Sequence, residues 1–400
     1  MDIAGEAMNH DSENLSRRTA LGRIASSAAL GMGGAAGCGA SVAASELSPS
    51  DPMPPAVVAA GRDRTSPTGS RCGCGLIDAH SHYLPPTYAQ ALADEGLVTL
   101  DGGFPVPQWS EEKALAHMDR HGIEASMLSV SSPTVGFLKD PVARRRLARE
   151  VNEFAAALVK NKPNRFGGFA TLPLPDVQAS LDEIGYALEV LRLDGVVMET
   201  NVHGVYLGDA RLDPIFADLN RRRATVFLHP TSPPCLESVG LGRPAPILEF
   251  PMDTARTVTD LIFAGTLTRY PDIRMIIPHA GGALTAVAER IAAFSSLPFL
   301  NQRPAGGAAE VNRVLASLYY DLAGSASDAA IERLRRLTSM THILFGSDFP
   351  FTPAAGIEAN VESFRTLTGL TKSEHEAIAK GNAIQLFPRL ARTRGSERRS

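Results

Sequence analysis

Short apolar segments alternate with amphipathic segments along most of the chain, from residue 75 onward. Eight apolar segments have the length and composition of β-strands: residues 76–80, 125–130, 166–172, 195–200, 225–229, 274–279, 318–322 and 343–347. Helical periodicity or Ala/Leu/Arg-rich composition marks the segments between them: residues 140–160, 177–191, 212–222, 255–269 and 283–294. Eight strands that alternate with helices predict an α/β fold, one (β/α)8 TIM barrel. A doubly wound open sheet is the alternative, but no dinucleotide-binding glycine motif follows the first strand.

The N-terminal part of the chain has the composition of a targeting segment. Residues 1–45 contain paired arginines in the sequence SRRTAL (residues 16–21), followed by a mildly apolar Gly/Ala-rich run. This pattern predicts a twin-arginine-like export signal and a periplasmic location; the alternative is a basic N-terminus on a cytoplasmic enzyme. Residues 35–38 (AAGC) resemble a lipoprotein cleavage site with Cys38 as a lipid anchor, although the usual Leu before the cysteine is missing.

Residues 46–74 are rich in Pro, Ser and Ala and lack periodicity, so we expect a disordered linker there. The catalytic domain is then expected over residues 75–395. A formal net charge of −4 argues against broad electrostatic attraction to nucleic acid or to an anionic membrane surface. After the first fifty residues, no apolar run is long enough to predict a transmembrane span.

Histidine and aspartate side chains, which can bind metal ions or transfer protons, lie at the ends of the predicted strands. His80 and His82 follow the first strand, and His229, His279 and Asp348 end the fifth, sixth and eighth. The carboxyl ends of all barrel strands meet at one rim, and alternate residues of a strand share a face. Imidazole nitrogens and a carboxylate are good ligands for a divalent ion and can leave one position open. The sequence therefore predicts a metal site.

Two insertions are predicted to overhang this rim. Residues 101–109 follow the first strand, and residues 231–253 follow the fifth. Their apolar, Pro-rich composition suits walls around an organic ligand, or simple capping of the barrel. Trp109, the only tryptophan, lies in the first insertion, where it is expected to contact ligand or to pack in the core.

Several short motifs around these residues are shared with a known family. They are Asp78-x-His80-x-His82, His229, the HAGG sequence at residues 279–282 and the GSDFP sequence at residues 346–350. Together they resemble the amidohydrolase superfamily, and more narrowly its aminocarboxymuconate-semialdehyde decarboxylase-like branch. The sequences GFPVP (103–107), LPLPD (172–176), YLGD (206–209) and LEFP (248–251) look most like 6-methylsalicylate decarboxylase-type members. The resemblance covers residues 76 to about 390.

The resemblance implies roles for individual residues. His80, His82, His229 and Asp348 would hold one divalent ion, and His279 would be a catalytic residue beside it. Arg290 matches an arginine that in similar decarboxylases reaches the substrate of the neighbouring subunit, which implies a homodimer. Many hydrolytic members carry a carboxylated lysine at the end of strand four. Here the strand over residues 195–200 contains no lysine, which argues for a mononuclear site. Glu199 and His203 are alternative groups near the ion, and both are expected at the edge of the substrate pocket.

The expected activity is non-oxidative decarboxylation of a hydroxylated, salicylate-like aromatic acid or of a related unsaturated acid. Asp348 would bring a proton to the carbon that bears the carboxylate, and His279 would orient that proton. The alternative is a metal-dependent hydrolase of a lactone or amide on the same barrel, since the ligands alone suit both reactions. A non-catalytic exported binding protein is a third alternative, which the intact ligand set disfavours. Zinc is the expected ion, with manganese as the alternative.

Overall fold

The computed structural model of the protein describes residues 75–300 and 302–394. The predicted export signal, the whole predicted linker and Cys38 lie outside these residues. Within the described part of the chain, no helix combines the length and apolar character that crossing a bilayer requires.

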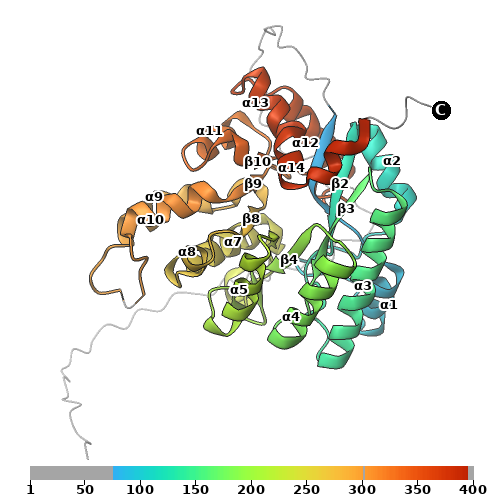
Figure 1. The fold of residues 1–400 in the computed structure, drawn as a ribbon, viewed down its shortest axis with the longest axis horizontal. Coiled ribbons are helices and arrows are strands. Elements are labelled where there is room, and N and C mark those ends of the chain that lie inside the picture. Colours follow the sequence, from blue (N-terminus) through green and yellow to red (C-terminus); the bar gives the residue numbers. More distant parts are fainter. Residues whose placement is uncertain (1–74, 301, 395–400) are drawn as a thin grey trace, which may run out of the picture. The chain divides into compact units, whose positions relative to one another are not determined.

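Eight parallel strands form the central sheet, in the order in which they occur along the chain (Figure 1). They are β1 (Leu76–His82), β2 (Ile123–Ser129), β3 (Phe166–Thr171), β4 (Gly195–Glu199), β7 (Thr225–His229), β8 (Arg274–Ile277), β9 (Tyr319–Asp321) and β10 (Ile343–Leu344). A two-stranded antiparallel ribbon, β5 (Asn201–Val202) and β6 (Val205–Tyr206), follows β4. The predicted TIM barrel is confirmed, because sequential parallel pairing of this kind is the topology of that fold.

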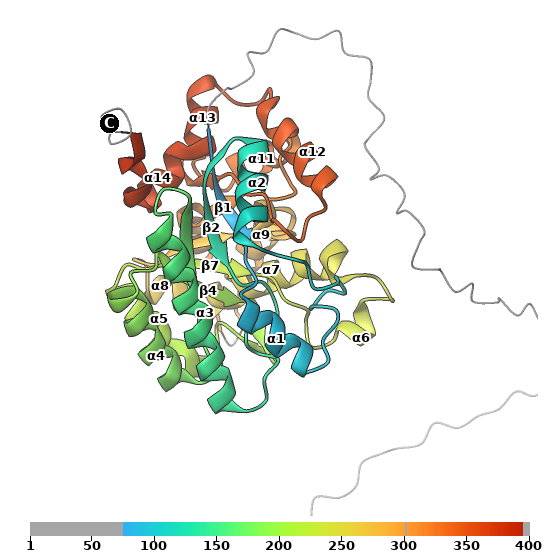
Figure 2. The same cartoon turned by 90° about the vertical axis from the view of Figure 1, so that its right-hand side faces the viewer.

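Helices surround the strands. They are α1 (Pro86–Asp94), α2 (Glu111–His121), α3 (Pro141–Asn161), α4 (Val177–Gly185), α5 (Asp213–Arg221), α6 (Leu236–Val239), α7 (Ala245–Phe263), α8 (Thr266–Arg269), α9 (Leu284–Phe294), α10 (Gly307–Ser317), α11 (Asp328–Arg335), α12 (Ala354–Arg365), α13 (Lys372–Glu376) and α14 (Asn382–Leu386). Figures 1 and 2 show α3, α4 and α5 side by side on one flank of the barrel. Each covers strands with an apolar face, as expected for amphipathic helices.

The first and last strands close the barrel through a few backbone contacts. The amide of Ala79 donates to the carbonyl of Phe345 at 2.9 Å, and the amide of Asp348 donates to the carbonyl of His80 at 2.8 Å. A Cβ at Gly346 would lie 2.9 Å from Cβ of His80, so only glycine allows this approach. β10 ends at Leu344 and is shorter than the predicted strand over 343–347, because the chain beyond it pairs with β1 only through separate backbone hydrogen bonds and one parallel bridge.

The core has two parts. A large cluster fills the space between strands and helices, and a smaller one fills the barrel interior beside α14. Phe227 of β7 belongs to the interior cluster, and His229 follows it by two residues. Since alternate strand residues share a face, this spacing directs His229 toward the barrel axis at its carboxyl end.

The prediction of helix α7 was wrong at its start. The sequence pattern predicts a helix over residues 255–269, but α7 begins ten residues earlier, at Ala245, and contains Pro251. Proline lacks an amide hydrogen and normally disfavours a helix interior. Here the early turns bury Phe250 and Asp253 against the barrel, and this packing outweighs the missing hydrogen bond.

Candidate metal centre

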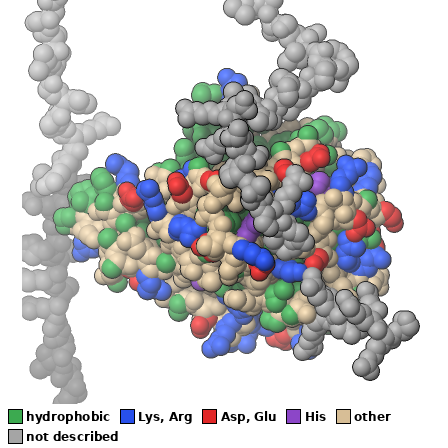
Figure 3. Space-filling view, turned by 90° about the horizontal axis from the view of Figure 1, so that it is seen from above, with side chains coloured by type: hydrophobic (Ala, Val, Ile, Leu, Met, Phe, Trp, Pro, Cys, Tyr) green, Lys and Arg blue, Asp and Glu red, His purple; other side chains and the backbone are tan. Residues whose placement is uncertain are grey.

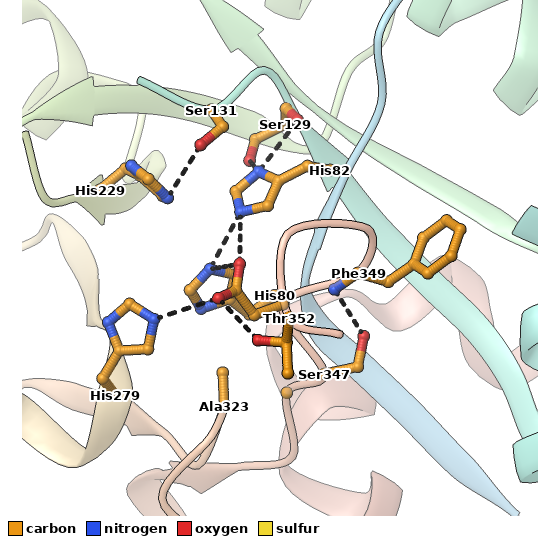
Figure 4. A network of polar contacts seen from close by, with 12 residues as sticks. His80, His82, Ser129, Ser131, His229, His279, Ala323, Ser347, Phe349 and Thr352 are labelled. Atoms are coloured by element: carbon orange, nitrogen blue, oxygen red, sulfur yellow. Dashed lines mark hydrogen bonds and ion pairs between the residues drawn. The ribbon is translucent and has the colours of Figure 1, made fainter. Parts of the chain in front are cut away.

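Two imidazoles at the end of β1 point toward each other. His80 and His82 are fully buried, and their Nε2 atoms lie 3.1 Å apart (Figure 4). The Nδ1 atom of His80 lies 2.9 Å from Oδ2 of Asp321. The Nδ1 atom of His82 lies 3.3 Å from the carbonyl oxygen of Ser129, an atom that can only accept. Both Nδ1 atoms therefore act as donors, and both Nε2 atoms face the shared space, where each offers a lone pair when it carries no proton.

A third imidazole comes from β7. Nδ1 of His229 lies 2.8 Å from the carbonyl oxygen of Pro230, which leaves Nε2 as the atom that faces the other histidines. The ring centroids of His229 and His82 are 4.8 Å apart. One ligand atom from each of His80, His82 and His229 fits within a group no wider than 4.8 Å.

The carboxylate of Asp348 completes the cluster. Its Oδ1 lies 3.5 Å from Nε2 of His80 and 3.2 Å from Nε2 of His82. Thr352 donates a hydrogen bond to Oδ2 at 3.1 Å, and Nε2 of His279 lies 3.7 Å from the same oxygen. Asp348 and His279 both have positive φ angles, 59° and 55°, an uncommon backbone conformation for side chains of this kind. Their side chains are 20% and 23% exposed, so they face the cavity above the buried histidines.

These residues fit a divalent ion. Two ligands about 2.1 Å from one tetrahedral ion lie about 3.4 Å from each other, close to the separations found here. The Nε2 atoms of His80 and His82, 3.1 Å apart, are close enough to share one positive charge, either a proton in an N–H···N hydrogen bond or a metal ion. His80, His82 and His229 can thus hold one ion, and Asp348 lies next to His80 and His82, with His279 beside it. The complete ligand set stays a prediction.

The electrostatics of the cluster also favour a cation. Burial lowers the pKa of His82, and it lowers the pKa of His229 well below the ordinary value, so both stay neutral. Burial also acts against a charged His80, but Asp321 and Asp348 outweigh it and raise the pKa of His80 to about 10. For Asp348, burial is outweighed by hydrogen bonds from His279, His80 and His82, which hold its pKa well below the ordinary value. The two carboxylates therefore favour positive charge at this position, which a divalent ion would supply.

A cavity of about 450 Å³ opens above the cluster. His229, His279 and Asp348 lie in its wall, together with Phe104 and Phe250 from the two predicted insertions. A cavity of this size accommodates a small organic ligand. Both insertions therefore contribute to the walls, as their composition suggests.

The three predicted substrate contacts do not line the cavity of their own chain, and Arg290 was predicted to reach that of a neighbouring subunit. Glu199 ends β4 and is buried, and its Oε1 has no hydrogen-bond partner among the described residues. Burial, followed by the charge of Asp101, raises the pKa of Glu199 to about 8. Trp109 packs edge-to-face against Tyr83 and Phe154, and Arg290 is exposed on α9 with its guanidinium 4.3 Å from the ring centroid of Phe294. Glu199, Trp109 and Arg290 are absent from the described lining of the cavity.

Sequence reasoning missed four residues. Asp321 ends β9 and contacts His80, so the strand-end rule that found the histidines could have found it. Asp78 belongs to the recognised motif; its Oδ2 accepts a hydrogen bond from the hydroxyl of Ser347 at 2.6 Å, joining β1 to the segment before Asp348. Asp101 and Arg333 line the cavity from a loop and from α11. Asp101 opens the predicted insertion over residues 101–109 but was not singled out, and Arg333 stands in no sequence pattern that predicts such a place.

Comparison with known proteins agrees with this geometry. The chain is 35% identical over 317 residues to the 6-methylsalicylic acid decarboxylase of Penicillium expansum. The alignment covers 78% of this chain and 96% of that protein. A solved structure of an amidohydrolase II superposes with a TM-score of 0.73 at 33% identity, covering 78% of this chain and all of that one. The dihydroxybenzoic acid decarboxylase of Polaromonas sp. JS666, solved with manganese and 2-nitroresorcinol, gives a TM-score of 0.66 at 22% identity, covering 78% and 97%.

The predicted resemblance, including its likeness to 6-methylsalicylate decarboxylase-type proteins, is confirmed. The sequence profile described as Amidohydrolase matches residues 77–389, nearly the whole described barrel. The chain belongs to the amidohydrolase family.

Proposed function

We propose that the protein is a metal-dependent, non-oxidative decarboxylase of a hydroxylated aromatic carboxylic acid. The observation that carries the proposal is the place of the ligand cluster: four donors from the ends of three strands lie at the floor of a cavity with aromatic side chains in its wall. The relatives support the reaction, since the alignment with the 6-methylsalicylic acid decarboxylase covers almost the whole length of that protein. A salicylate-like acid matches both the size of the cavity and its mixed aromatic and polar lining.

Direct loss of CO2 from an aromatic ring would leave an electron pair in the ring plane, where the ring cannot delocalise it. Protonation of the carbon that bears the carboxylate avoids this problem. The new C–H bond takes its electrons from the ring, and the C–C bond to the carboxylate then breaks and returns its electron pair to the ring. One proton is consumed, and CO2 and a phenol are released.

Asp348 and His279 are placed to handle that proton. Both face the cavity, with Nε2 of His279 3.7 Å from Oδ2 of Asp348. Because the pKa of Asp348 is held low, its carboxyl group gives up a proton readily once it has received one. We assign the delivery of the proton to Asp348 and its supply and orientation to His279.

A divalent ion bound by the cluster would bind the carboxylate and the adjacent hydroxyl group and polarise the ring. Imidazole and carboxylate donors suit Zn²⁺ and Mn²⁺ alike, and we propose one of these two as the resident ion. Manganese has the support of the Polaromonas decarboxylase structure, which holds it on the same fold. Elemental analysis of protein purified without added metal identifies the ion.

Turnover of ortho-hydroxybenzoates tests the reaction. The metal-loaded protein is incubated with 6-methylsalicylate and salicylate, and CO2 and the matching phenol are measured. We expect both products in equal amounts. Acid release from a panel of lactones and amides, without release of CO2 from the benzoates, would instead establish the hydrolase alternative.

A substitution at His229 ties the activity to the cluster. His229→Ala should abolish turnover while the fold is retained, because it removes a ligand but leaves β7 intact. His342→Ala is the matched control, because that histidine lies in the turn before β10 and beside Tyr319, away from the cluster. Full activity of the His229→Ala protein would remove this residue from the site.

We also propose that the enzyme is a homodimer. Ile247, Leu248 and Met252 of α7 are exposed, as are Phe294 at the end of α9 and Phe299 after it. Figure 3 shows hydrophobic side chains gathered at one end of the face it presents, whereas acidic and basic side chains are interspersed elsewhere. Arg290 belongs to this exposed α9 surface and does not line the cavity of its own chain, so it would serve the cavity of the second subunit. Analytical ultracentrifugation should show a dimer that Leu248→Asp converts to monomer.

We propose, from the sequence alone, that the chain is exported through its twin-arginine-like signal, with Cys38 as a candidate lipid anchor. Replacement of Arg17 and Arg18 by Lys should retain the protein in the cytoplasm, as measured by cell fractionation. Equal recovery of wild type and variant in the cytoplasm would support the cytoplasmic alternative. Metabolic labelling with a fatty acid, compared between wild type and Cys38→Ala, tests the anchor.

A further inference from the structure

The charged side chains that line the cavity are unevenly distributed. Two carboxylates, Asp101 and Asp348, face the space that an anionic substrate has to enter. Arg333 is the single Lys or Arg side chain in the described lining. Among the described residues, the guanidinium of Arg333 is therefore the permanent positive charge that a substrate carboxylate meets in the cavity. The proposed metal ion would supply the other positive charge.

Barrel topology places Asp101 and Arg333 on opposite sides of the mouth. Asp101 is hydrogen-bonded to Ser132, after the second barrel strand, and to Thr231, after the fifth. Arg333 lies in α11, which connects the seventh barrel strand, β9, with the eighth, β10. In a closed ring of eight strands, the position between the seventh and eighth strands lies across from the region between the second and fifth.

The side chain of Arg333 is available for a ligand. It is exposed, and among the described residues no carboxylate lies within ion-pair distance of it. Its neighbour Arg335 differs, because it forms an ion pair with Glu374 at 2.6 Å and donates to the carbonyl of Gly369. A guanidinium that lines a cavity without an internal partner suits recognition of a carboxylate, which it can bind through two parallel hydrogen bonds.

We propose that Arg333 is the residue by which each chain recognises the carboxylate of its own substrate on entry. The inference rests on the proposed function and adds a residue that makes the cavity bind carboxylic acids more tightly than neutral phenols. Arg333 offsets the repulsion from Asp101 and directs the carboxylate toward the floor of the cavity. The product of decarboxylation has lost the group that Arg333 binds, so this residue favours entry of the acid without retaining the phenol.

Arg333→Gln in the metal-loaded, full-length protein tests the inference. The KM for 6-methylsalicylate should rise roughly 5- to 20-fold, the range expected for one charge-assisted hydrogen-bonding partner at an exposed site. The kcat should change less than about twofold, because the residue acts before the chemical step. Inhibition by 3-methylphenol, the matching neutral product, should be unchanged. The salt dependence of kcat/KM should become weaker, because a steering charge has been removed.

Arg336→Gln is the matched control. Arg336 follows α11 directly, is exposed and is absent from the described lining, so its substitution should leave the KM unchanged. Arg333→Lys should recover part of the lost affinity for the acid. An unchanged KM in Arg333→Gln, or an equal loss of affinity for 3-methylphenol, would overturn the inference. The same holds if Arg290→Gln raises the KM and Arg333→Gln does not.

Calorimetric titration separates this inference from the proposed function. Binding of 6-methylsalicylate and of 3-methylphenol is measured for wild type and Arg333→Gln, and neither titration requires turnover. If wild type binds the acid but releases no CO2, the proposed reaction fails while the role of Arg333 is still tested. If wild type decarboxylates the acid and Arg333→Gln binds it equally well, the proposed reaction stands and the role of Arg333 fails.

Discussion

At the scale of single residues, Asp321 has the widest influence on the metal centre. Its Oδ2 accepts from His80 at 2.9 Å, and its Oδ1 accepts from the backbone amides of His279 and Ala323 at 3.0 Å. One carboxylate thus fixes the tautomer of a ligand and the backbone of the residue proposed to supply the proton. Such outer partners keep a ligating imidazole in the correct orientation and increase its basicity.

Asp321→Asn should lower the affinity for the divalent ion by roughly 10- to 100-fold, because an amide is a weaker acceptor for the His80 ring. Competition with a chromogenic chelator measures this change. Excess metal should restore most of the activity. Asp272→Asn, at an exposed carboxylate before β8, is the control and should leave the affinity unchanged. A wild-type affinity for Asp321→Asn would show that Asp321 has a structural role only.

His117 provides a pH-dependent contribution to stability. It lies on α2, stacked on Phe349 with ring centroids 4.3 Å apart, and burial lowers its pKa to about 4. The unfolded chain, with a pKa near 6.5, binds the proton more readily below that pH. Folding stability should therefore be complete above about pH 6.5 and fall as the pH decreases toward 4, by up to about 3 kcal/mol from this residue.

Thermal unfolding at pH 7 and pH 5 measures this contribution. The difference between the two midpoints should be smaller for His117→Phe than for wild type, because phenylalanine has no proton to gain. His342→Phe, at a less buried site, serves for comparison. An equal pH dependence of His117→Phe and wild type would exclude His117 as the source.

The sequence indicates the place of some site residues and not of others, for a physical reason. His80, His82, His229 and Asp348 could be predicted because parallel strands deliver their last residues to one rim, whatever the details of packing. Asp101 and Arg333 occupy positions set by the paths of a loop and of a short helix. Those paths depend on tertiary contacts that no local pattern encodes.

At the scale of structural elements, Asp101 joins three connections over the cavity. Its Oδ2 accepts from the hydroxyls of Ser132 and Thr231 at 2.7 and 2.5 Å, and from the amide of Ser232 at 2.7 Å. The loop after α1, which carries Phe104 into the cavity wall, is thereby held against the ends of β2 and β7.

Asp101→Ala should release this loop and enlarge the cavity. We expect the KM to rise roughly tenfold, because the loss of a preformed wall and the cost of ordering the loop on binding outweigh the removal of one repelling charge. Chymotrypsin should cleave more rapidly at Leu97 or Leu100, as mass spectrometry of the fragments would show. Asp94→Ala, an exposed control at the end of α1, should change neither result. Unchanged proteolysis and KM in Asp101→Ala would show that other contacts hold the loop.

The boundaries of helices and strands show where tertiary packing outweighs the local sequence pattern. β7 begins and ends where the sequence predicts, since its apolar run is bounded by polar and turn residues. α7 begins earlier than predicted, because burial of Phe250 and Asp253 compensates for Pro251 inside the helix. The second insertion thus contributes helical structure to the cavity wall.

At the scale of the whole barrel, the metal centre connects the first strand to the last. β1 supplies His80 and His82, while Asp348 follows β10, and few backbone hydrogen bonds join these two edges of the sheet. The hydrogen bond between Asp78 and Ser347 adds one side-chain link. An ion held by ligands from both edges would add another, so metal binding and barrel closure should be coupled.

Removal of the metal should therefore lower the melting temperature. A ligand present at 100 times its dissociation constant stabilises the folded state by about 2.7 kcal/mol, which corresponds to roughly 3–8 °C for a domain of this size. Calorimetric scans of chelator-treated protein, with and without added Zn²⁺ or Mn²⁺, measure this shift. His229→Ala should show a much smaller metal-dependent shift, because the ion then lacks the ligand from β7. If the variant and the wild type respond equally to the metal, the stabilising ion binds somewhere other than this cluster, and the link between closure of the barrel and its chemistry would be lost.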